Sequence, residues 1–86
     1  MEKLYHNGEE YDIATYKVEI YNNDKLEKTE YRLFGACFPS PRSEAIAWGS
    51  NQAFWLKKVE GWENPVVKIY DENDNIIYVA ESKYFI

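Results

Sequence analysis

The chain has 86 residues, of which 45% are apolar and 29% charged, and its net charge is −5. This length predicts a single domain over residues 1–86, and the composition excludes a disordered chain. The negative charge disfavours non-specific binding to duplex nucleic acid, which needs lysines and arginines to neutralise phosphates. No apolar run is long enough to span a bilayer, so we expect no membrane partner.

The first strong pattern is an alternation of apolar and polar residues over residues 10–22. The apolar residues that share one face are Ala14, Tyr16, Val18 and Ile20. This period-two pattern predicts a half-buried strand. The preceding Asn7-Gly8 dipeptide is typical of a type I′ turn and predicts a short additional strand before it.

A turn of Asn and Asp at residues 22–25 leads into a second strand over residues 26–38. We expect these two strands to form a long hairpin. The polar half of the second strand comes first and its apolar half last. Both faces of its far end, near Cys37, are therefore expected to be covered.

A helix is predicted from Ser40 to about Glu60. Ser40 is a good N-cap, Pro41 suits the first helical position, and Glu44 complements the positive end of the helix dipole. Gly61 is expected to terminate the helix in the left-handed conformation.

An apolar stripe at spacings of four, three, four and three runs along this helix. Its members are Trp48, Gln52, Trp55, Val59 and Trp62, with Ala45 and Leu56 beside them. We expect this stripe to dock on the sheet. Gly49 weakens the helix by about 1 kcal/mol relative to Ala, which indicates either a close approach to a strand or a kink.

Residues 66–70 and 76–80 read as two short strands joined by a turn over residues 71–75. The element order is then β-β-α-β-β. It predicts an α+β fold: a four-stranded, mainly antiparallel sheet with one long helix packed on one face.

The sequence contains no catalytic or metal-binding constellation. His6 and Cys37 are the only residues of their types, too few for a zinc site, and a Cys–His nucleophile pair conflicts with the apolar strand position of Cys37. The turn at residues 71–75 has Asp and Asn at alternate positions, as in a calcium loop. Ile76 and Ser82 stand where that loop needs Gly and Glu. We predict no enzymatic activity, no cofactor and no metal.

Two groups of residues are candidates for binding. Trp62, Tyr84 and Phe85 would form an exposed aromatic patch, and Asp71, Glu72 and Asp74 an acidic turn. The alternative for Trp62 is packing against the last helical turn. The closing residues 84–86 are too apolar for a solvated tail, so we expect them to dock on the body or on a second copy.

Three functions follow from these features. The leading hypothesis is a small, non-enzymatic, cytoplasmic protein-binding module, an inhibitor or adaptor that blocks a basic surface of its partner. The single cysteine and the polar N-terminus, which predicts no signal peptide, favour the cytoplasm. The second is single-stranded nucleic-acid binding by sheet aromatics, with basic residues drawn from Arg32, Arg42, Lys57 and Lys58. The third is a homodimer formed through an edge strand or the C-terminus.

Overall fold

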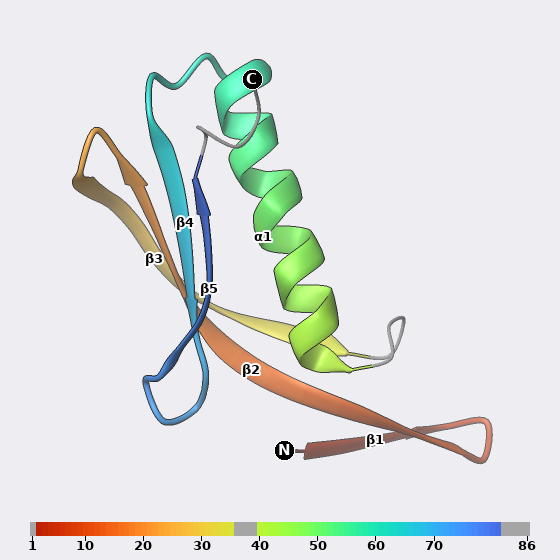
Figure 1. Ribbon diagram of the computed structural model, residues 1–86. Helices are drawn as coiled ribbons and strands as arrows, with labels where there is room; N and C mark the ends of the chain where they lie inside the picture. The colour runs from red at the N-terminus through yellow and green to blue at the C-terminus, as the bar shows by residue number, and fades with distance from the viewer. Residues whose placement is uncertain (1, 36–39, 82–86) are drawn as a thin grey trace.

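The computed structural model describes residues 2–35 and 40–81 and shows one helix packed against a five-stranded sheet (Figure 1). In chain order the elements are β1 (Glu2–His6), β2 (Glu9–Asn22), β3 (Lys25–Gly35), α1 (Pro41–Lys58), β4 (Pro65–Tyr70) and β5 (Ile76–Glu81). Every pairing among these strands is antiparallel. The predicted α+β class and element order are confirmed, and β1 is the additional N-terminal strand.

The central strand is β2, with which three other strands pair. β1 pairs with residues 9–13 of β2, whereas β3 and β4 both pair with residues 17–22. Because β3 and β4 share these partners, they lie on opposite edges of β2. The strand order is therefore β3-β2-β4-β5, with β1 beside the first part of β2.

Two tight turns in the N-terminal half have their central residues in the left-handed region. The φ angles are 53° at Asn7 and 80° at Gly8, and 53° at Asn23 and 64° at Asp24. Positive φ at both central positions defines the type I′ turn, whose twist matches that of the flanking strands. Asn, Asp and Gly tolerate this conformation best. The turns predicted at both places are confirmed.

The helix α1 begins and ends near its predicted capping residues. The Ser40 side chain accepts a hydrogen bond from a backbone N–H in the first turn, and Pro41 is the first helical residue. The Glu44 carboxylate accepts a hydrogen bond from the backbone N–H of Gly35, which ties the start of α1 to the end of β3. Beyond the last turn, Gly61 has a φ of 76°.

The core lies between α1 and the inner face of the sheet. The inner residues of β2 are all buried, as predicted: Ala14, Tyr16, Val18 and Ile20. The ring of Phe34 lies 5.9 Å from that of Tyr16 and 5.8 Å from that of Trp48. Each aromatic ring can bury a large area, which a small domain needs for a stable core.

The face of α1 that packs on the sheet differs from the predicted stripe. The residues buried there are Pro41, Ala45, Gly49, Ala53 and Leu56. Trp55 is 51% exposed and Val59 is exposed as well, so the prediction that these two residues dock on the sheet is wrong. Small side chains instead let the helix approach the strands: a Cβ on Gly49 would lie 2.9 Å from Cδ1 of Ile69. The close-approach interpretation of Gly49 is confirmed.

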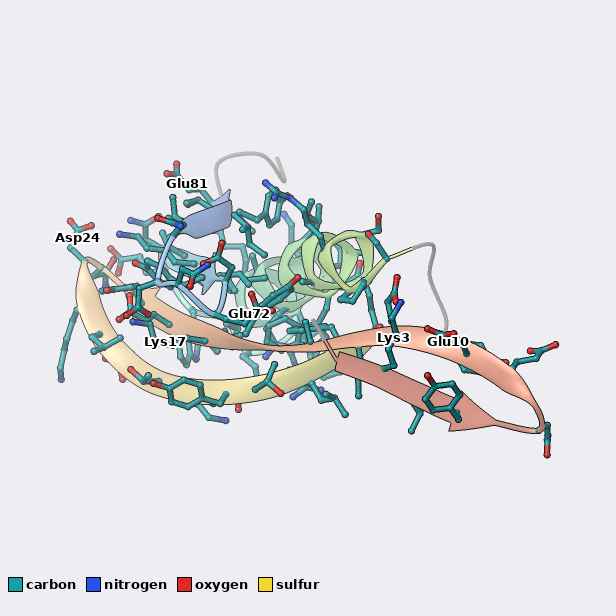
Figure 2. All side chains as sticks on the ribbon, turned by 90° about the horizontal axis from the view of Figure 1, so that it is seen from below. Lys3, Glu10, Lys17, Asp24, Glu72 and Glu81 are labelled. Atoms are coloured by element: carbon teal, nitrogen blue, oxygen red, sulfur yellow. The ribbon has the colours of Figure 1, made fainter. Side chains whose placement is uncertain are left out.

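The other face of the sheet is open. Figure 2 shows α1 on one side of the sheet only, and no described element packs on the opposite side. On the far half of β3, Tyr31 is 73% exposed and Leu33 59% exposed. At Leu33 the prediction that both faces are covered is therefore wrong, because a single helix covers a single face. The last residues of the predicted strand, 36–38, are not part of the described structure. Cys37 lies outside the described residues.

Candidate functional site

The predicted acidic turn connects β4 to β5, and part of it has a local structural role. The Asp71 carboxylate accepts hydrogen bonds from the backbone N–H groups of Asn73 and Asn75, both at 2.9 Å. Asp74 has a φ of 61° and forms an ion pair with Lys17 at 3.1 Å. Hydrogen bonds from an Asp side chain to backbone N–H groups just after it, like those of Asp71, are typical of a tight turn. Among the described residues, no group of three or more His, Cys, Asp or Glu side chains is arranged to hold a metal ion.

The predicted aromatic patch is not assembled within the described part of the chain. Trp62 is half-buried and packs against the core, and its backbone N–H donates a hydrogen bond to the carbonyl of Leu56 at 2.9 Å. This contact with the last helical turn matches the alternative stated for Trp62 from the sequence. Tyr84 and Phe85 lie outside the described residues.

A different region has the character of a binding surface. β1 and residues 7–13 form a two-stranded arm, called the arm below, that extends past the N-terminal end of α1 (Figure 1). β1 contacts mainly β2, and α1 has far more contact with β4, β5 and β3 than with β2. On the arm, Tyr5 is 70% exposed and Leu4 is 44% exposed. Exposed tyrosine and leucine on a projecting element are available to a partner.

Negative charge is concentrated at this end of the molecule. Residues 2–12 contain four acids and one base, and residues 71–75 contain three acids and no base. Both segments lie beyond the last β2–β4 pair, Lys17 with Tyr70, and we call them together the acidic end. Their formal charge is −6, while that of the whole chain is −5, so the remaining residues carry a net +1.

The charges of the acidic end act on their neighbours. Lys3 lies between Asp12 and Glu10, with its Nζ 3.1 Å from a Glu10 carboxylate oxygen, and it is labelled on the arm in Figure 2. Hydrogen bonds to Asp12 and then to Glu10 raise the pKa of Lys3 above its usual value. On the inner face, burial raises the pKa of Tyr16, and the negative charge of Glu72 raises it further. The field of the turn therefore reaches the inner face of the sheet.

The open face carries aromatic residues beside lysines. In the row centred on β2, Lys17 pairs with Tyr31 on one side and Tyr70 on the other. The Lys17 ammonium stands 4.6 Å from the centroid of the Tyr70 ring and also forms the ion pair with Asp74. Lys68 is engaged in a similar way, since its ammonium stands 4.8 Å from the centroid of the Tyr21 ring.

The basic residues expected beside these aromatics lie elsewhere. Arg32 is on the inner face, where its guanidinium stacks 4.6 Å from the centroid of the Trp48 ring. Arg42, Lys57 and Lys58 belong to α1 and are therefore on the helix side of the sheet. The aromatic side chains and the predicted basic track of the nucleic-acid hypothesis are consequently on different faces.

A small hollow of about 190 Å³ opens where β2 and β5 end and β4 begins. Its lining residues are Tyr21, Asp24, Val66, Lys68 and Glu81. The Lys68 ammonium covers the Tyr21 ring, so the aromatic surface that would attract a cationic ligand is already occupied. We assign no ligand to this hollow.

Sequence reasoning missed the arm as a candidate site. The pair Glu9-Glu10 reads as an ordinary solvated turn, and Leu4 and Tyr5 read as a short edge strand. A charge count over short windows would have indicated the site, because residues 2–12 alone carry a formal charge of −3. Exposure of the arm depends on where α1 lies, which the local pattern does not contain.

Comparison with known proteins leaves the site to be judged on its own geometry. No family model, curated protein or solved structure matches the chain. Within the described ranges, no helix combines the length and the apolar character needed to cross a bilayer.

Proposed function

We propose that the chain is a non-enzymatic protein-binding module of the cytoplasm, an inhibitor or adaptor that docks its acidic end on a basic surface of a partner protein. The observation that carries this proposal is the formal charge of −6 on residues 2–12 and 71–75, while the rest of the chain is close to neutral. A charge distribution of this kind orients a molecule as it approaches a basic partner.

The form of the arm suits this role. A hairpin closed by the Asn7-Gly8 turn holds its backbone in shape before binding, which lowers the entropy lost in the complex. Tyr5 and Leu4 supply apolar area, and the carboxylates around them supply orientation. Lys3 is held by Glu10 and Asp12, so it competes little with the basic groups of a partner.

The test uses two double variants with equal changes in charge. Glu9→Gln/Glu10→Gln removes two charges from the arm, and Glu60→Gln/Glu63→Gln removes two from the loop after α1, at the opposite end of the molecule. The parent chain and each double variant are used to capture partner proteins from a nuclease-treated lysate of the source organism. The affinity of the captured protein is then measured at about 0.1 M and about 1 M salt, where the Debye length falls from about 10 Å to about 3 Å.

The proposal expects a discrete protein whose affinity falls with salt. It also expects affinity for the arm variant to be about tenfold weaker, or ~0.7 kcal/mol for each lost charge, while the loop variant binds like the parent. Equal losses in both variants would show that only the total charge matters. Binding that is indifferent to salt and to both changes would rule out the acidic end as the docking surface.

A second candidate function is single-stranded nucleic-acid binding on the open face, favoured by the 73% exposure of Tyr31 beside Lys17. Bases stack on such rings with little dependence on sequence. Fluorescence anisotropy with a labelled oligonucleotide at low salt tests it. Binding that is lost in Tyr31→Ala would support this candidate, and an unchanged anisotropy at high protein concentration would remove it.

A further inference from the structure

The outer edge of β5 is the least protected strand edge of the sheet. Among the described strands β5 pairs only with β4, so a row of its backbone N–H and C=O groups faces away from the sheet. Natural sheets commonly block such edges with charged side chains. β3, the other long edge, has five charged residues among eleven, whereas β5 has one among six, Glu81 at its end.

We propose that β5 pairs in antiparallel fashion with β5 of a second copy, so that two five-stranded sheets join into one sheet of ten strands. The uncharged run of residues 76–80 consists mainly of β-branched and aromatic residues, which favour strand pairing. A strand that lacks charge along its length is a suitable partner for itself. The resulting dimer has the two-fold symmetry that most soluble oligomers share.

Symmetry limits how the two strands align. A two-fold axis perpendicular to the sheet keeps both helices on the same face, so residues that oppose one another must belong to the same face of the sheet. The axis then passes between the two copies of one residue of β5, and the pairings that keep most of this strand paired are centred on Tyr78 or on Val79. With the first centre Ile77 faces Val79 of the second copy, and with the second centre Val79 faces itself. Neither arrangement brings two like charges directly opposite, which would destabilise the pair.

The charges of the acidic end favour the antiparallel arrangement. The acidic turn at residues 71–75 directly precedes β5. Antiparallel strands of six residues place the two turns at opposite ends of the new pair, about 20 Å apart, whereas parallel strands would place them side by side. Pairing also covers part of Ile76, which is 52% exposed in the single chain.

The experiment measures the mass of the purified full chain by sedimentation velocity from low micromolar to high micromolar concentration. The mass is expected to rise from 10.2 kDa towards twice that value. Because each copy carries a charge of −5, screening at about 1 M salt removes repulsion and strengthens the dimer. This salt dependence is opposite to that expected for docking of the acidic end on a basic partner, so the two proposals fail separately.

Three lysine variants locate the interface. In the dimer, Val79→Lys and Ile76→Lys each introduce two positive charges, one from each copy, along the paired β5 strands. Each variant is expected to weaken association about tenfold or more. Ile76 is exposed, so Ile76→Lys retains the fold even where Val79→Lys does not. Thr29→Lys makes the same charge change at the exposed edge strand β3 and is expected to leave the dimer unchanged.

A parent chain that stays at 10.2 kDa at every concentration and both salts would overturn the proposal. So would a dimer that survives both changes in β5, or one that Thr29→Lys disrupts. Hydrogen exchange gives a second measurement: amides of residues 76–81 should exchange more slowly as the protein is concentrated, while those of β3 keep their rates.

Discussion

Gly49 is the residue at which the helix comes closest to the sheet. Gly49→Ala gains about 1 kcal/mol of helix propensity, but the new methyl would lie 2.9 Å from Cδ1 of Ile69 and 3.3 Å from the Tyr78 ring. Ile69 is fully buried, so the core must rearrange around the new methyl, and overpacking of this kind costs about 1–3 kcal/mol. We expect urea denaturation to show a free energy of unfolding lower by about 1 kcal/mol.

The control for this prediction is Ile69→Val, which removes the Cδ1 atom that the new methyl would meet. In that background, Gly49→Ala should destabilise the protein less, because the closest contact of the new methyl is gone and only the Tyr78 ring at 3.3 Å remains tight. A loss that is equally large in both backgrounds would contradict the assigned contact.

Tyr70 on the open face makes the free energy of unfolding depend on pH in the alkaline range. Burial raises its pKa to about 12, and a hydrogen bond to Glu19 contributes. In the unfolded chain a tyrosine loses its proton near pH 10, so the folded state binds more protons between about pH 10 and pH 12. Stability should therefore fall as pH rises through this range, and less steeply in Tyr70→Phe. If the free energy of unfolding falls equally steeply with pH in the parent and in Tyr70→Phe, this assignment is contradicted.

At the scale of the element, the two tryptophans of α1 separate the observed docking face from the predicted one. Trp48 packs edge-on against Phe34 and lies under the guanidinium of Arg32, whereas Trp55 is half exposed. We expect Trp48→Ala to lower the free energy of unfolding by about 3 kcal/mol and Trp55→Ala by less than about 1 kcal/mol. Urea denaturation of both variants tests this. Equal losses of stability in the two variants would indicate that Trp55 also docks on the sheet, as the sequence pattern predicts.

The elements themselves could be predicted because their signals are local. Ser40 and Gly61 lie at the ends of α1, and the Asn7-Gly8 turn defines the first hairpin, so a few neighbouring residues contain the information. The docking face of α1 could not be found in this way. Large side chains at Trp48 and Trp55 outline an apolar stripe, but the small residues between them decide how closely two layers approach.

The same distinction applies to the candidate sites. The sequence indicated the acidic turn at residues 71–75, since Asp and Asn there act through short-range bonds. It did not indicate the arm, because Leu4 and Tyr5 look like any short edge strand. Their exposure follows only from the length of β2, which extends past the helix and leaves β1 uncovered.

For the whole molecule, the centre of the sheet and the arm should differ in local stability. Residues 17–22 of β2 have strands on both edges and the helix on the inner face, whereas β1 pairs with one strand. We expect backbone amides of β1 to exchange at least about a hundredfold faster than those of residues 17–22. Hydrogen exchange followed by NMR measures both. Uniform protection would mean that the arm and the core open as one unit.

The separation of the arm from the core also bears on how the protein can evolve. The backbone of the arm depends on strand pairing and on the Asn7-Gly8 turn, and none of its exposed side chains fills the space beneath α1. Changes at Leu4, Tyr5 or Glu9 therefore leave the framework intact, as changes in a variable loop do. Lineages that follow a changing target should accumulate substitutions at this end of the molecule, while the small residues of α1 stay constant.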